Sequence, residues 1–292
     1  MRRTRPALPV VLIAALVGLV LGIGPAEAAR KDRSSPQPSS MEWAPADQAT
    51  ITPGAEMVTN GAQCTANFIF VERADVFIGW AAHCAGAGGG ATDTNGCLAP
   101  SLPLGTPVQI EGASQPGTLA YSSWETMQRS GETEQNACNY NDLALVRIDP
   151  ADHAKVNPSI PHWGGPTGLD VDGIEAAETV YGYGNSSLRF GIRALSPKTG
   201  PSLGTTADGW THPVYTVSPG IPGDSGGALL DPQGRAAGVL STLALAPLPG
   251  SNNYSDLASA LDYMHSRRGP QAVLEPGTEP FDPYQLPLDL GL

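Results

Sequence analysis

The sequence predicts an all-β fold, on the evidence of its composition and of its pattern of apolar runs. The chain has 292 residues, of which 15% are charged and 6% aromatic, while 35 are Gly and 28 are Pro. Gly and Pro at this frequency are typical of many turns between short strands. The length suits one fold of two packed β halves, which commonly spans ~200 to 250 residues, with additional terminal segments.

Short apolar runs separated by loops rich in Gly, Pro, Asn and Asp predict the individual strands. In order they are FIFV at 68, VFIGWAA at 76, LALVRI at 143, TVYGY at 179, VYTVS at 214, GALL at 227 and AAGVLS at 236. One helix is predicted over 255–268, with Ser255 capping its first turn and Gly269 and Pro270 ending it. Its apolar face contains Leu257, Ala260, Leu261 and Met264.

Residues 1–28 have the pattern of a secretory signal peptide. A basic start precedes an apolar run from about Ala7 to Ile23, and Ala26-Glu27-Ala28 forms a small-residue cleavage pattern. An uncleaved membrane anchor is the alternative, because the apolar run approaches the length of a transmembrane helix. The cleavage pattern and the polar sequence after it favour a secreted, extracellular protein without stable membrane association; a retained segment would instead place it in the cell envelope.

Both segments that flank the predicted strands are polar. Residues 29–56, rich in Ser, Pro and charge, predict a linker or propeptide, and 269–292, with five prolines and four acids, predict a disordered tail. The formal net charge is −12, and loss of three Arg and one Glu with residues 1–28 changes it to −14. An acidic surface of this size argues against nucleic acid as a partner.

Four cysteines, Cys64, Cys84, Cys97 and Cys138, lie in a chain predicted to be exported, where an even number indicates two disulfides. Three pairings are open on the residues alone. No C-x-x-C pair occurs and the spacings match no zinc pattern, so neither a metal nor a cofactor is expected.

Three short motifs point to nucleophilic catalysis. Ser225 lies in "GDSGG", His83 in "AAHC" at the end of an apolar strand, and Asp142 in "NDLAL" before another. Taken singly, His83 is more often a structural histidine and Asp142 a turn-forming acid. Together, and in the chain order His83, Asp142, Ser225, they supply a base, an orienting carboxylate and a nucleophile.

These motifs resemble those of the chymotrypsin-like serine peptidase family, and the resemblance extends over roughly residues 57–268. It implies two antiparallel β-barrels with a C-terminal helix, the boundary between barrels near 160–175, and a catalytic triad of His83, Asp142 and Ser225. The backbone N–H groups of Gly223 and Ser225 would form the oxyanion hole. It also implies a Cys64–Cys84 disulfide, which leaves Cys97 and Cys138 as the second pair.

The resemblance carries further expectations about activation and the substrate. No Ile-Val-Gly-Gly-like start precedes Cys64, so Asp224 is expected to pair with an internal group, as in shorter bacterial relatives, and any propeptide cut would lie in residues 29–60. Pro219 occupies the position that sets pocket charge, and Ser241, Thr242 and Leu243 would line the pocket, with Ser241 beside the catalytic Asp. We therefore expect small or medium apolar residues before the scissile bond rather than Arg or Lys.

The resulting hypothesis is a secreted, monomeric serine endopeptidase that acts on protein or peptide substrates through an acyl-enzyme intermediate. The alternative is a catalytically silent or latent relative that uses the same fold as an extracellular binding protein.

Overall fold

A computed structural model describes residues 39–87, 95–243 and 249–285, all within one compact unit. The predicted signal peptide lies outside the described residues. Among the helices that are described, none has the length and apolar character needed to span a bilayer.

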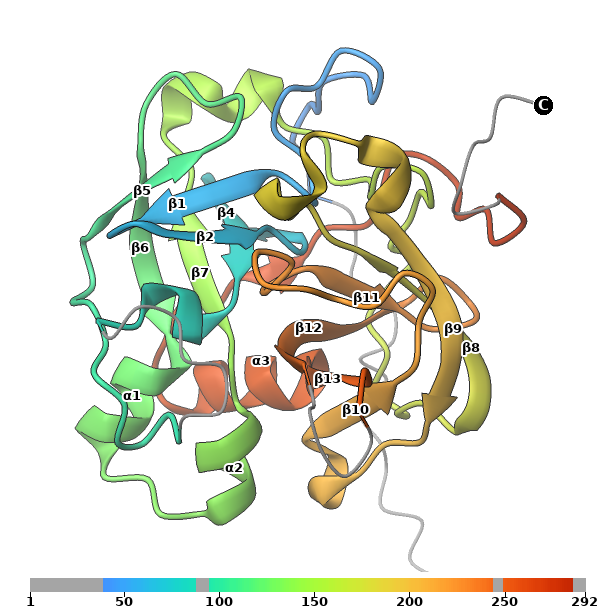
Figure 1. The fold of residues 1–292 in the computed structure, drawn as a ribbon. Coiled ribbons are helices and arrows are strands. Elements are labelled where there is room, and N and C mark those ends of the chain that lie inside the picture. Colours follow the sequence, from blue (N-terminus) through green and yellow to red (C-terminus); the bar gives the residue numbers. More distant parts are fainter. Residues whose placement is uncertain (1–38, 88–94, 244–248, 286–292) are drawn as a thin grey trace, which may run out of the picture. The chain divides into compact units, whose positions relative to one another are not determined.

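The first β-structure is an antiparallel sheet of eight strands in the described part of the chain, in the order β14-β3-β4-β7-β6-β5-β1-β2 (Figure 1). Its strands are β1 (Glu56–Thr59), β2 (Ala62–Thr65), β3 (Ile69–Glu72), β4 (Asp75–Trp80), β5 (Pro107–Ile110), β6 (Gly117–Ser122), β7 (Ala144–Arg147) and β14 (Val273–Leu274). The main hydrophobic core lies here, around fully buried side chains such as Trp80, Phe68 and Met57.

The second β-structure is a closed antiparallel barrel in the order β10-β13-β12-β11-β8-β9. Its strands are β8 (Ala176–Tyr183), β9 (Pro197–Leu203), β10 (Thr211–Val214), β11 (Ala228–Leu230), β12 (Ala236–Leu243) and β13 (Asn252–Asp256). A small apolar cluster that includes Val180 and Leu240 fills it. The all-β class with two antiparallel halves is confirmed, although among the described strands only this second half closes into a barrel.

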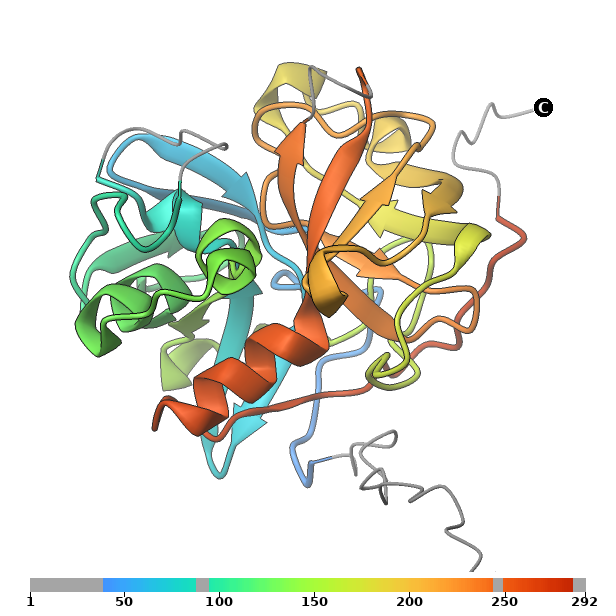
Figure 2. The same ribbon diagram turned by 90° about the horizontal axis from the view of Figure 1, so that it is seen from below.

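The described residues form three α-helices, two more than the sequence predicted. They are α1 (Ser123–Ser130), α2 (Gln135–Tyr140) and α3 (Leu257–Ser266). The predicted cap of α3 is wrong: Asp256 accepts from the Ser259 amide at 2.6 Å, whereas Ser255 ends up inside β13. Figure 2 shows α3 following directly from the barrel strand that precedes it.

The described parts of both flanking segments, residues 39–56 and 269–285, pack against the fold, whereas the sequence predicted a linker or propeptide and a disordered tail. Ile51 is fully buried and bridges to Val156, so the folded structure begins before residue 57. In the C-terminal segment, β14 pairs with β3. The buried carboxylate of Glu275 accepts hydrogen bonds from the Ser39 amide at 3.1 Å and the Trp43 indole at 3.1 Å. Proline and acidic residues thus did not prevent packing, because an open strand edge and half-buried donors of the N-terminal segment were available to the C-terminal one.

Candidate active site

Strand pairing brings His83 and Asp142 together. In the first sheet Trp80 of β4 pairs with Ala144 of β7, so a residue just after β4 and one just before β7 meet at the same end. Both side chains are nearly fully buried. The Asp142 carboxylate accepts from the His83 amide at 2.8 Å and from His83 Nδ1 at 2.7 Å. Since Nδ1 carries the proton in this bond, Nε2 is left as the acceptor of the ring.

Two serines of the barrel side hold Asp142 further. Ser241 on β12 donates to Asp142 Oδ2 at 2.6 Å, and the Asp142 amide donates to the Ser255 hydroxyl at 3.2 Å. Ser241 therefore lies where the sequence predicted, beside the carboxylate. The orientation of Asp142, and through it that of the imidazole, is fixed from both β-structures.

Ser225 lies on the loop between β10 and β11, and its position is coupled to that of His83. Its carbonyl accepts from the Thr65 amide at 2.7 Å, while the neighbouring Cys64 is bonded to Cys84, the residue after His83. Within the described residues the Ser225 hydroxyl has no hydrogen-bond partner, and the residue as a whole is 7% exposed. Hydrogen bonds between catalytic groups are commonly long in unliganded enzymes and tighten with substrate.

The backbone around Ser225 offers two unused donors. Neither the Gly223 nor the Ser225 N–H has an acceptor among the described residues, while the Asp224 N–H donates to Ile221 at 2.9 Å. Gly223 has a φ of +96°, a conformation that favours glycine, and a Cβ there would lie 2.4 Å from Gln63 Oε1. Backbone N–H groups without an acceptor on either side of Asp224 are available to stabilise an oxyanion.

A neighbouring turn holds the peptide that carries the Gly223 N–H. The Ser186 hydroxyl donates to Pro222 O at 2.6 Å and accepts from Leu188 N at 3.1 Å. In a planar trans peptide the C=O and N–H point in opposite directions. Because the Ser186 hydroxyl holds the Pro222 carbonyl, the Gly223 N–H of the same peptide points away from Ser186.

Asp224 is paired internally, as the sequence led us to expect, and its partners are two buried cations. Lys198 Nζ lies 2.9 Å from its Oδ2 and Arg189 Nη2 lies 2.5 Å from the same atom. Burial raises the pKa of Asp224, but the Lys198 charge and the Arg189 hydrogen bond outweigh this and the net pKa is lowered. Burial lowers the pKa of Lys198, and the nearby Asp224 charge, which raises it, offsets this only in part. Sequence reasoning missed both cations, because no local motif marks such distant partners.

The residues predicted to line the substrate pocket have varied surroundings. The Pro219 carbonyl accepts from Arg189 at 3.2 Å and from Lys198 at 3.5 Å. Thr242 accepts from the Asn253 amide group at 3.0 Å, and Leu243 is half-buried at the end of β12. Their role in substrate binding stays a prediction.

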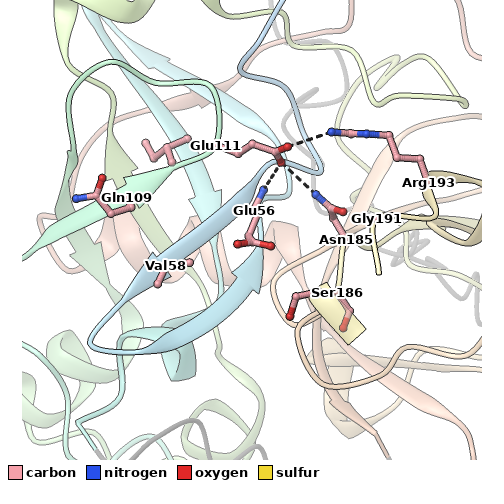
Figure 3. Close-up of a pocket in the computed structure, with 10 residues that line it drawn as sticks. Glu56, Val58, Gln109, Glu111, Asn185, Ser186, Gly191 and Arg193 are labelled. Atoms are coloured by element: carbon pink, nitrogen blue, oxygen red, sulfur yellow. Dashed lines mark hydrogen bonds and ion pairs between the residues drawn. The ribbon is translucent and has the colours of Figure 1, made fainter. Parts of the chain in front are cut away.

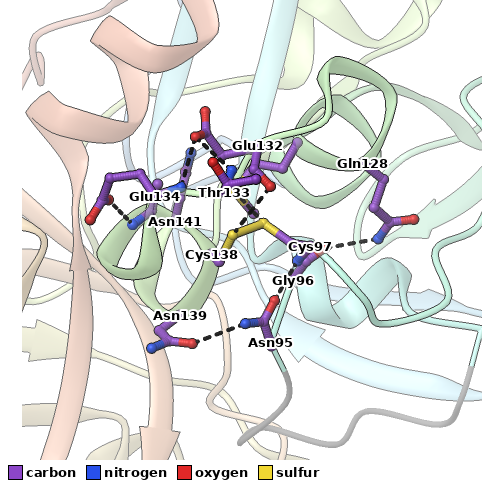
Figure 4. Close-up of a disulfide and its surroundings, with 12 residues drawn as sticks. Asn95, Gly96, Cys97, Gln128, Glu132, Thr133, Glu134, Cys138, Asn139 and Asn141 are labelled. Atoms are coloured by element: carbon purple, nitrogen blue, oxygen red, sulfur yellow. Dashed lines mark hydrogen bonds between the residues drawn. A yellow bond between two sulfur atoms is a disulfide. The ribbon is translucent and has the colours of Figure 1, made fainter.

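Both disulfides have the expected pairing, Cys64–Cys84 and Cys97–Cys138. Figure 4 shows the second, which ties Cys138 of α2 to the segment beginning at Asn95; Gly96 N also donates to Cys138 O at 2.8 Å. This fixes the stretch that leads into Asp142. Cys64, His83 and Cys84 lie close enough together to suggest a metal site, but the sulfurs are oxidised to a disulfide and offer no thiolate.

Solved structures with a similar fold are serine proteases. Thermobifida fusca protease A matches with a TM-score of 0.50 and 18% identity, over 78% of this chain and all of the other. Cellulomonas bogoriensis chymotrypsin matches at 0.42 and 17%, over 77% of this chain and 97% of its own. A glutamic acid specific serine protease matches at 0.46 and 15%, over 77% of this chain and all of its own. No family model and no curated protein matches the chain. The chain has the chymotrypsin-like fold.

Proposed function

We propose that this protein is a secreted serine endopeptidase in which His83, Asp142 and Ser225 form the catalytic triad. The observation that carries the proposal is the buried His83–Asp142 pair, bonded at 2.7 Å through Nδ1, on the same structure as a serine flanked by two free backbone N–H groups. An imidazole in this tautomer carries no proton on Nε2, which lies 3.7 Å from Cys84 Sγ and can accept a proton from a hydroxyl. The two N–H groups supply what a serine nucleophile alone lacks.

In the proposed reaction Ser225 Oγ attacks the carbonyl carbon of the scissile peptide, and its proton passes to His83 Nε2. The carbonyl oxygen becomes an oxyanion that the Gly223 and Ser225 N–H groups stabilise. Asp142 stabilises the imidazolium without taking its proton. The intermediate collapses as the C–N bond breaks and Nε2 returns the proton to the leaving amine, which leaves Ser225 acylated. Water, deprotonated by the same Nε2, then releases the acid product.

Two features support the substrate and location that we propose. Arg189 and Lys198 both donate to the Pro219 carbonyl and together exceed Asp224 by one positive charge, so a positive substrate side chain would be disfavoured there. This agrees with small or medium apolar residues before the scissile bond. Two disulfides suit an oxidising, extracellular environment.

Digestion of a denatured carrier protein tests the proposal. Purified protein, as produced and after limited trimming of the residues before 39, is incubated with reduced and alkylated casein, and new N-termini are identified by mass spectrometry. We expect internal cleavage by the parent and none by Ser225→Ala or His83→Ala. Cleavage that persists in Ser225→Ala would refute the triad, and no cleavage by either form of the parent would favour the silent binding protein.

A further inference from the structure

A pocket of about 390 Å³ opens between the first sheet and the segment joining β8 to β9 (Figure 3). The sheet contributes Glu56 and Val58 of β1, Gln109 of β5 and the adjoining Glu111, while Asn185 and Arg193 come from the joining segment. None of these residues belongs to the predicted pocket for the residue before the scissile bond.

The two carboxylates in this pocket differ in their partners. Glu111 is held on all sides: it accepts from Arg193 at 3.0 Å, from the Glu56 amide at 3.0 Å and from Asn185 Nδ2 at 3.2 Å. The Glu56 carboxylate has no hydrogen-bond or ion-pair partner within the described residues. Two carboxylates face one cation, so the pocket has a net negative charge and an unused acceptor.

The negative charge of Glu56 lacks a positive partner that a ligand could supply. Burial, and then the nearby Glu111, raise the pKa of Glu56. A positive group placed against Glu56 would reverse the second of these effects. A lysine or arginine side chain has the required charge, and a flexible apolar stem that Val58 and Ile110 of the pocket wall can contact.

The pocket borders the loop that carries the proposed nucleophile. Asn185 N donates to Thr65 Oγ1 at 2.9 Å, and Thr65 N donates to the Ser225 carbonyl at 2.7 Å. Gln63 Nε2 bridges the Asn185 and Gly223 carbonyls at 3.1 and 3.2 Å. A peptide bound at Ser225 is thus adjacent to the pocket wall.

We propose that this pocket binds a Lys or Arg side chain of the substrate on the leaving-group side of the scissile bond, with Glu56 as the main determinant. The leaving-group side is the choice that these contacts favour, because the pocket adjoins Thr65 and Gly223 and shares no member with 219 and 241–243, the residues predicted to bind the preceding substrate residue. The proposal rests on the proposed function, whose substrate class it narrows.

Cleavage-site profiling tests it. A tryptophan-containing peptide library with varied residues on both sides of one bond is digested by the parent and by the variants Glu56→Gln and Glu72→Gln. Glu72 is the control, because its carboxylate is half-buried on a strand of the same sheet but does not line the pocket. We expect the parent to favour Lys or Arg over Gln at one position after the bond by roughly fivefold, as for a partly exposed ion pair. Glu56→Gln should lose this preference and Glu72→Gln keep it, and added salt should weaken it.

The outcomes separate this proposal from the proposed function. Cleavage by the parent without a basic preference on that side, or a preference that Glu56→Gln retains, overturns the pocket assignment alone. A parent that neither cleaves nor reacts with a fluorophosphonate probe overturns the proposed function, and this inference with it.

Discussion

Replacement of Ser186 by alanine should slow catalysis without weakening substrate binding. The Ser186 hydroxyl holds the Pro222 carbonyl at 2.6 Å, and this bond orients the Gly223 N–H on the opposite side of the peptide. A hydrogen bond of this kind contributes about 0.5 to 1.5 kcal/mol. Loss of about 1.5 kcal/mol would let the misoriented peptide compete with the native orientation and lower kcat by about tenfold. The decrease in kcat should not exceed about a hundredfold, which is the effect of losing one oxyanion donor completely.

The assay is a measurement of kcat and KM on one peptide substrate without Lys or Arg after the scissile bond, because Ser186 also lines the pocket proposed for such side chains. The affinity of a peptide aldehyde, whose adduct contains the oxyanion, is measured beside it. We expect kcat and aldehyde affinity to fall by similar factors in Ser186→Ala, with KM little changed, and Ser186→Thr to restore much of both. Ser202→Ala is the matched control, since Ser202 is also buried in the barrel side and its hydroxyl accepts one backbone N–H, from Gly204 at 2.9 Å. A kcat for Ser186→Ala equal to that of Ser202→Ala would refute the positioning role.

Three stability predictions follow from buried charges and disulfides, each checked by denaturant unfolding. Asp224→Asn should lower the free energy of unfolding by about 3 to 5 kcal/mol, because it leaves two buried cations without their carboxylate. Lys198→Met leaves Asp224 paired with the Arg189 guanidinium and should cost less than half as much. Equal losses for the two variants would contradict this. Replacing both Cys97 and Cys138 by Ser opens a 41-residue separation and should cost about 4 kcal/mol, and no loss under oxidising conditions would contradict the estimate from loop entropy. Burial raises the pKa of Asp170 from 3.8 to about 6, so between these pH values the folded state binds more protons than the unfolded state. The free energy of unfolding should therefore fall as the pH rises from about 4 to about 6. Asp170→Asn should abolish this fall, and an unchanged pH profile would argue against the Asp170 carboxylate as its source.

Much of the candidate site was accessible from the sequence, because its parts lie in short motifs. "AAHC", "NDLAL" and "GDSGG" mark His83, Asp142 and Ser225, and the first two are brought together by the pairing of the apolar strands beside them. Arg189 and Lys198 had no such mark. Each is an ordinary charged residue in sequence, and its role depends on a barrel that places it beside Asp224.

The fold itself was predicted in class but not in all its elements. The helix α1 follows Ser122 and has Glu125 in its first turn, a capping pattern that was present in the sequence and that outweighed the polar character of the segment. The C-terminal segment was wrongly predicted to be disordered, because its proline and acid content reflects solubility rather than long-range pairing. In the structure β14 pairs with the edge strand β3, and Leu274 is buried there. Such long-range opportunities are not visible in a local pattern.

The central claim is that Ser225 is an activated nucleophile, and the most direct test is the intact mass of the purified protein after reaction with a fluorophosphonate. This probe requires an activated serine and an oxyanion hole but no particular substrate. We predict one adduct per chain on the parent and none on Ser225→Ala. An unreacted parent, both as produced and after removal of the residues before 39, or an adduct that persists in Ser225→Ala, would contradict the claim.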